Sequence, residues 1–228
     1  MATFYDLFVQ NAERYPSNIA LEIQRGERTE SYSYADARKM AEAVGRWLLE
    51  NRFEPGTRVM ILADNHPRWV TTYLGIIAAG CVAVPLDTAF HADQVAKLMK
   101  DSGAALVFCD RKHLKLLQEA SQGMAVGIVL TDGKPEGQQQ LKGDLDSMFA
   151  AASGGFNPVA AEPDAIVGLL YTSGTTADPK GVMLTHANML GEVDAVLGWV
   201  KLGPEDALLG VLPLFHVLSQ MANILMPL

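Results

Sequence analysis

Hydroxyl side chains, a glycine and a lysine gather in the segment YTSGTTADPKGV, which runs from Tyr171 to Val182. Glycine lets backbone N–H groups turn toward an anion without a side-chain clash. The Ser and Thr hydroxyls add hydrogen-bond donors, and Lys180 adds a mobile positive charge. A polar surface turn would explain Gly174 and Pro179, but not hydroxyls on both sides of the glycine. The composition therefore predicts a loop that binds a polyphosphate.

The same segment differs from other motifs that bind nucleotides or carry a nucleophile. A Walker loop needs Gly-Lys-Ser/Thr at the start of a helix, whereas Lys180 is followed by Gly181. A nucleophile elbow needs glycine two residues before its serine, and Ser173 has Tyr171 there. No G-x-G-x-x-G occurs in the chain, so the sequence gives no support to nicotinamide binding. These differences argue against a P-loop switch, a nucleophile elbow and a dinucleotide-binding fold.

The loop must be positioned by the elements around it, and strand-like and helix-like segments alternate along the chain. We expect strands at 18–23, 28–32, 58–63, 81–86, 104–109, 125–131 and 166–171. Strands separated by helices indicate a parallel sheet, and the right-handed crossover rule places helices on both of its faces. The predicted fold class is therefore α/β, with a doubly wound, mainly parallel sheet.

Several residues mark where the helices should begin and end. Ser33 and Asp36 have the spacing of a capping box at a helix start. Asn65 is placed to cap the next helix. A third helix is predicted over 92–101 and should end at Gly103.

Two segments interrupt this alternation. The stretch 132–163 is rich in Gly, Gln and Ala, and we expect a connector with one short helix. We therefore divide the chain into a first α/β subdomain with its connector, 1–163, and the start of a second, incomplete subdomain, 164–228. The last stretch, 217–228, carries no charge. It is interpreted either as a helix docked on the core or as the end of a chain cut before its fold is complete.

Composition excludes several classes of protein. The chain has 228 residues, of which 49% are hydrophobic and 19% charged, so it is not a disordered chain. Two cysteines, Cys81 and Cys109, exclude a disulfide scaffold and suggest a reducing compartment. The net charge of −8 argues against a nucleic-acid partner. We find no signal peptide or membrane-length apolar run, and we expect a cytoplasmic protein.

The segment YTSGTTADPKGV resembles the phosphate-binding signature of the adenylate-forming, or AMP-binding, enzymes. This family includes acyl-CoA synthetases, luciferases and peptide-synthetase adenylation domains. The resemblance extends to AAGCVAVPLDTAF at 78–90, LTHANML at 184–190 and PLFHV at 213–217. It implies that this chain has the fold of the N-terminal portion of the family's large domain.

The resemblance also implies roles for individual residues. The loop that wraps the ATP β- and γ-phosphates would comprise Thr172, Ser173, Gly174, Thr175 and Thr176. Lys180 would neutralise the departing pyrophosphate, and His216 would lie between the carboxylate substrate and the nucleotide. A core histidine bonded to a backbone carbonyl is the alternative for His216, and we favour a structural role for His186. The five histidines show no metal-ligand spacing, so no metal site is expected.

The family reaction implied by the resemblance uses ATP, Mg²⁺ and coenzyme A. A carboxylic acid attacks the α-phosphate of ATP to give an acyl-adenylate, and a thiol then displaces AMP. The segment ADNHPRWVTTYLGIIAAG is similar to the long-chain branch, so we expect a fatty acid. An aryl-CoA ligase, a peptide-synthetase adenylation domain and a non-catalytic half that acts as a binding or regulatory module remain alternatives.

Two departures from the family pattern qualify these expectations. Ala177 stands where the family usually has glycine, and alanine costs about 1 kcal/mol if that position needs a positive φ. The family's Tyr-Gly-x-Thr-Glu and Thr-Gly-Asp motifs are not in this chain. We therefore expect a fragment that is inactive alone and that self-associates through an exposed, incomplete face. Peripheral membrane contact stays open.

Overall fold

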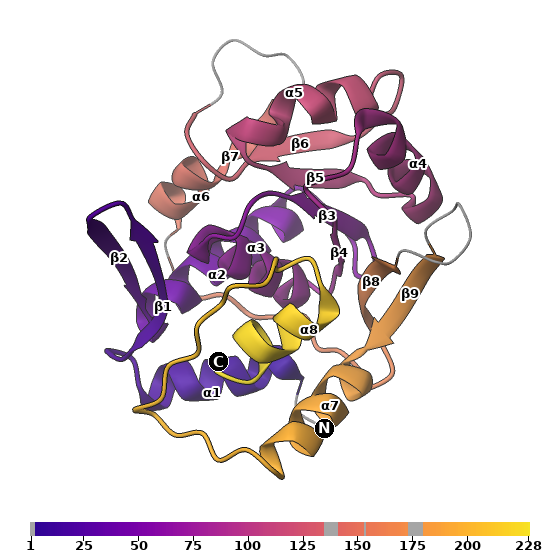
Figure 1. Ribbon diagram of the computed structural model, residues 1–228. Coiled ribbons are helices and arrows are strands. Elements are labelled where there is room, and N and C mark those ends of the chain that lie inside the picture. Colours follow the sequence, from indigo (N-terminus) through magenta and orange to yellow (C-terminus); the bar gives the residue numbers. More distant parts are fainter. Residues whose placement is uncertain (1–2, 135–140, 153, 173–179) are drawn as a thin grey trace.

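One mostly parallel sheet organises the computed structural model, which describes residues 3–134, 141–152, 154–172 and 180–228. Within these residues the strand order is β7-β6-β5-β3-β4-β8-β9, and β9 alone runs antiparallel to its neighbour (Figure 1). The strands are β3 (Arg58–Leu62), β4 (Val82–Pro85), β5 (Leu106–Cys109), β6 (Gly127–Leu130), β7 (Leu141–Asp144), β8 (Ile166–Thr172) and β9 (Lys180–Thr185). The predicted α/β class with a mainly parallel sheet is confirmed.

Helices cover both faces of this sheet because its strands alternate between two cores. In β3, Val59 and Ile61 belong to one core, and Met60 and Leu62 belong to the other. The first core also contains residues of α1 (Phe4–Arg14), α2 (Tyr34–Glu50), α3 (Pro67–Ala78), α6 (Leu145–Ala151) and α7 (His186–Leu197). The second contains residues of α4 (Ala92–Ser102) and α5 (Arg111–Ala120). The doubly wound arrangement follows directly from this alternation.

A separate two-stranded antiparallel sheet lies beside the main one. It pairs β1 (Ile19–Arg25) with β2 (Arg28–Ser33), as the two short predicted strands require. Ser33 then caps α2: its hydroxyl accepts from the Asp36 N–H, and the Asp36 carboxylate accepts from the Ser33 N–H. At the other end of a helix, Gly103 adopts a left-handed φ of 63° after α4. The predicted Ser33–Asp36 capping box and the predicted helix end at Gly103 are confirmed.

Four elements differ from the sequence expectation. We predicted no helix at α1 or α5 and no strand at β7 or β9. For α1 and α5 a signal was present, since Thr3 and Asp110 cap them through their side chains. By contrast, β7 and β9 are half-exposed edge strands with little apolar alternation, so pairing with β6 and β8 decides their conformation.

The chain end packs against the beginning of the chain. Residues 217–228 form α8 (Val217–Gln220) and a π-helical turn, η1 (Met221–Leu225), in which Ile224 and Leu225 are buried. The Asn11 side chain donates to the Leu228 carbonyl at 2.9 Å, and the Tyr34 hydroxyl donates to the Pro227 carbonyl at 2.8 Å. The division at 163/164 stays a prediction, with β8 joined to β4 in the same sheet. No helix among the described residues is both long and apolar enough to cross a bilayer.

Candidate functional site

The two ends of the predicted polyphosphate loop lie side by side at one end of the β8–β9 hairpin. The strand register pairs Thr172 with Lys180, and both residues are exposed. Since β8 runs parallel to β4, this end of the hairpin lies at the same sheet edge as the carboxyl ends of the other parallel strands. Four further loop residues, together with Ala177, lie outside the described part of the chain: Ser173, Gly174, Thr175 and Thr176. The structure therefore places the loop's flanks and its lysine.

A hydrogen bond joins the hairpin to α4 near its loop end. The Tyr171 hydroxyl donates to Asp101 Oδ2 at 2.6 Å. Burial, together with this hydrogen bond, raises the pKa of Tyr171 above its ordinary value, so the hydroxyl stays a donor. Opposite it, a Cβ on Gly181 would lie 2.9 Å from Leu169 Cδ1, so the flexible Leu169 side chain would have to shift. Lys180 thus begins a strand, not a helix, in agreement with the exclusion of a Walker loop.

Asn65 fixes the segment before His216, the second predicted site residue, at the same sheet edge. Its Nδ2 donates to the Leu212 carbonyl at 2.9 Å, and its Oδ1 accepts from the Leu214 N–H at 2.8 Å. The prediction that Asn65 caps a helix is wrong: His66 is the N-cap of α3, and its Nδ1 accepts from the Arg68 N–H. Asn65 instead fixes the segment that leads into His216.

His216 is exposed where it precedes α8, and its ring lies 4.4 Å from the Phe215 ring. The alternative of a core histidine is therefore wrong for this residue. His186, in contrast, is buried at the start of α7, and its Nδ1 has no hydrogen-bond partner among the described residues. Burial lowers the pKa of His186, which favours the neutral ring.

Replacing Asn65 with alanine should remove both hydrogen bonds and lower the free energy of unfolding by about 1–2 kcal/mol. The Leu214 amide should then exchange with solvent faster, because its acceptor is gone. Hydrogen exchange followed by mass spectrometry over 209–217 measures this. Asn51→Ala is the matched control, since Asn51 is exposed and its side chain donates to the Trp47 carbonyl within its own helix end. Equal exchange in the two variants would contradict the assigned role of Asn65.

Sequence reasoning missed a group of polar residues at the carboxyl ends of β3, β5 and β6. Asp64 follows β3, Asp110 follows β5 and Thr131 follows β6, and all three line one cavity of about 400 Å³. No motif scan would join them, because Asp64 and Asp110 lie 46 positions apart in the chain. The available signal was topological: a polar residue within two positions of the end of each of three buried strands.

The comparisons with known proteins agree on one family. A family model described as "AMP-binding enzyme" matches residues 8–228. The chain is 31% identical over 199 residues to 4-coumarate–CoA ligase 2 of Nicotiana tabacum, covering 85% of this chain and 36% of that protein. It is 27% identical over 244 residues to long-chain-fatty-acid–CoA ligase 1 of Cavia porcellus, covering 98% of this chain and 35% of that protein.

A solved structure shows the shared fold. The chain superposes on the anthranilate CoA ligase AuaEII, determined in complex with anthranoyl-AMP, with a TM-score of 0.89 and 20% sequence identity. The match covers 99% of this chain and 43% of that one. The chain spans about a third of the length of the curated relatives given above.

Proposed function

Because the chain belongs to the AMP-binding enzyme family, we propose that it forms the polyphosphate-binding part of an ATP-dependent acid–thiol ligase. The observation that carries this proposal is the pairing of Thr172 with Lys180, which presents a hydroxyl and a lysine side by side at the mouth of the loop. That pair suits a polyphosphate, since a charge-assisted hydrogen bond is stronger than a neutral one. Mg²⁺ would arrive bound to ATP as part of the substrate.

In the proposed reaction a carboxylate oxygen bonds to the α-phosphorus of ATP, and the bond to pyrophosphate breaks. The sulfur of coenzyme A then bonds to the acyl carbon, and AMP leaves. Lys180 and the loop 172–176 would hold the pyrophosphate portion and offset its charge as it departs. His216 would line the approach of the carboxylate. We propose a fatty acid as the substrate, with aryl and amino acids as the competing classes.

These 228 residues alone should bind ATP weakly and complete neither step. Each charge-assisted contact contributes about 1.5–3 kcal/mol, while association costs about 4–15 kcal/mol. A few such contacts therefore support a dissociation constant on the order of 1 mM. Titration of the ¹⁵N-labelled chain with Mg·ATP should shift the amide signals of Thr172 and Lys180. Unchanged signals there at saturating ATP would refute the site, and ATP–pyrophosphate exchange by the purified chain would refute its inactivity.

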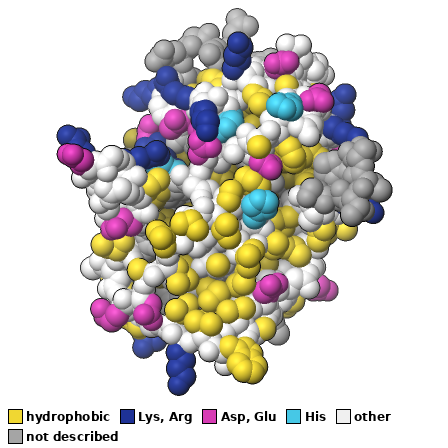
Figure 2. All heavy atoms as spheres, in the orientation of Figure 1, with side chains coloured by type: hydrophobic (Ala, Val, Ile, Leu, Met, Phe, Trp, Pro, Cys, Tyr) yellow, Lys and Arg dark blue, Asp and Glu magenta, His cyan; other side chains and the backbone are white. Residues whose placement is uncertain are grey.

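The proposal extends to self-association through an apolar surface. Figure 2 shows hydrophobic side chains gathered over the lower half of one face, where Figure 1 places α8 and the segment between α7 and α8. Trp199 is 92% exposed, Leu209 86% and Val211 73%. Trp199 alone exposes about 200 Å², whereas contiguous apolar patches on a monomer rarely exceed a few hundred Å². A second copy of the chain would bury such a surface by two-fold pairing.

We expect the chain to elute as a dimer or larger species, with a mass that rises with concentration. The double variant Trp199→Ser, Leu209→Glu should shift it toward monomer. The exposed apolar area falls, and the glutamates at position 209 of the two copies repel each other. Light scattering coupled to size exclusion measures the mass. Val9→Ser, on a partly buried residue of α1, is a control expected to leave the mass unchanged. A concentration-independent monomer in the unmodified chain would contradict the prediction.

A further inference from the structure

The cavity at the ends of β3, β5 and β6 lies at the point where the strand order of the sheet reverses. The chain runs from β3 to β4 on one side, and then crosses back over β3 to place β5 on the other side. The turns that leave β3 and β5 therefore diverge, and a crevice opens between them. In open α/β sheets, ligands bind in the crevice outside the carboxyl ends of the strands at this point. The cavity of about 400 Å³ occupies that position.

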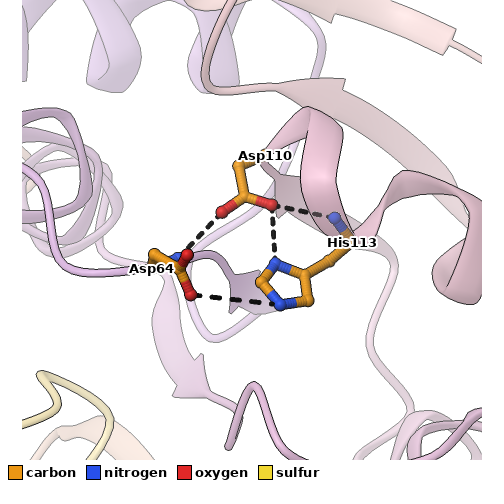
Figure 3. A group of neighbouring side chains, drawn as sticks. All are labelled: Asp64, Asp110 and His113. Carbon is orange, nitrogen blue, oxygen red and sulfur yellow. Dashed lines mark hydrogen bonds and ion pairs between the residues drawn. The ribbon is translucent and has the colours of Figure 1, made fainter.

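A buried histidine is held in one orientation beside this crevice (Figure 3). The Nδ1–H of His113 donates to Asp110 Oδ1 at 2.6 Å, and the backbone N–H of His113 donates to the same oxygen at 3.0 Å. The other oxygen of Asp110 accepts from the Asp64 N–H at 2.8 Å. Asp110 thus ties the turn after β3 to the start of α5. With the proton on Nδ1, the Nε2 lone pair of His113 is available for a ligand.

The free nitrogen of His113 points toward a second carboxylate. Its Nε2 lies 4.0 Å from Asp64 Oδ1, which is beyond hydrogen-bond length (Figure 3). His113 is only 6% exposed, whereas the Asp64 side chain is 49% exposed and can adjust. A tetrahedral zinc ion with bonds of about 2.0–2.2 Å holds two such ligand atoms about 3.4 Å apart, so a shift of about 0.6 Å by the exposed Asp64 side chain would close the site.

We propose that His113 Nε2 and Asp64 Oδ1 bind a divalent transition-metal ion at this crevice, with Asp110 as the positioning residue. A ligating histidine characteristically donates its other ring N–H to a carboxylate, which is the arrangement of Asp110 and His113. Imidazole with a carboxylate suits Zn²⁺ and Co²⁺ better than Mg²⁺ or Ca²⁺. Asp64 lines the crevice, so the remaining coordination positions would open toward it. This site uses no residue of the polyphosphate loop and does not rest on the proposed function.

Charged side chains near the site affect how tightly it would bind a metal ion. The Lys112 ammonium lies 2.7 Å from Asp64 Oδ2, the carboxylate oxygen that faces away from His113. Coordination through Oδ1 therefore leaves the Lys112 ion pair in place, but the ammonium repels an incoming cation. Removal of that charge should tighten metal binding. Loss of the Lys112 charge should raise the metal affinity, whereas loss of a ligand should lower it, so the two effects can be told apart.

The test is a titration of the metal-free chain with Co²⁺, followed by its visible absorption, with Zn²⁺ as the competitor. We expect saturable binding below about 1 mM, and at least a tenfold loss of affinity in both His113→Gln and Asp64→Asn. Lys112→Gln should bind several-fold more tightly. His91→Gln, which changes an exposed histidine at the start of α4, should match the unmodified chain. Lys180→Ala should also match it, because the loop is not involved.

Circular dichroism and thermal melts check the fold of each variant. Asp64→Asn keeps the test decisive if His113→Gln fails to fold, since Asp64 is at the surface. Asp110 also caps α5, so a lower Tm in Asp110→Asn says nothing about the metal. The informative readout for Asp110→Asn is a loss of Co²⁺ affinity with an altered absorption spectrum. The proposal is overturned if the unmodified chain shows no saturable Co²⁺ absorption, or if His113→Gln and Asp64→Asn, as folded, bind as well as it does.

Discussion

Replacing Gly75 with alanine should lower the free energy of unfolding by about 3 kcal/mol. Gly75 lies where α2 and α3 touch, and a Cβ there would meet Val44 Cβ at 2.5 Å and the Ala41 carbonyl oxygen at 2.6 Å. One of these neighbours is backbone, so no side-chain rotation relieves the clash and the two helices must separate. The same displacement would move the start of α3, which adjoins Asn65 and the crevice.

Gly191→Ala is the matched control for this prediction. Gly191 is also a helical glycine, but it is exposed in α7, and a Cβ there meets nothing within 4 Å. Alanine at that position should raise the free energy of unfolding by about 0.5–1 kcal/mol, because it restricts the unfolded chain and favours helix. Urea unfolding with a constant slope measures both values. A Gly75→Ala variant with a free energy of unfolding equal to or above that of the unmodified chain would show that the α2–α3 contact tolerates a methyl group.

Replacing Lys180 with alanine should weaken Mg·ATP binding by about 10- to 100-fold, because it removes a charge-assisted contact worth about 1.5–3 kcal/mol. The amide shifts that ATP induces at Thr172 should disappear over the accessible concentration range. Lys180 is exposed, and its backbone pairing with Thr172 does not depend on its side chain. The hairpin should therefore keep its structure, which the unperturbed spectrum of the free variant would show.

Lys201→Ala controls for the loss of one positive charge. Lys201 is exposed on the segment after α7 and carries the same charge at a different place. Its removal should leave the ATP titration unchanged apart from a small, salt-sensitive effect. If the two lysine variants weakened ATP binding equally, general electrostatic attraction would explain the binding, and the assignment of Lys180 to the pyrophosphate would fail.

Local signals in the sequence predicted much of the fold. The Ser33–Asp36 box and Gly103 mark helix ends because their hydrogen bonds and backbone angles involve neighbouring residues only. The buried strands were predictable from their apolar runs. The edge strands β7 and β9 were not, because a half-exposed strand is stabilised by the ladder it joins and not by its own composition.

The candidate site, too, was predictable from the sequence only in part. The segment 171–182 predicts its chemical class, because the residues that suit a phosphate are consecutive. Asn65 was misread as a cap, because its true partners, Leu212 and Leu214, lie 147 and 149 positions away. No local pattern reports a contact at that separation.

By itself, then, the sequence determined the α/β class and the family, and it predicted the polyphosphate chemistry, because all three rest on contiguous residues and regular periodicity. The tertiary structure alone decided that Thr172 faces Lys180 across a hairpin and that His113 faces Asp64 across a crevice. The physical reason is that strand order and pairing are set by burial of the whole sheet. Side chains far apart in the chain, such as those of Asp64 and His113, therefore meet only once the sheet has formed.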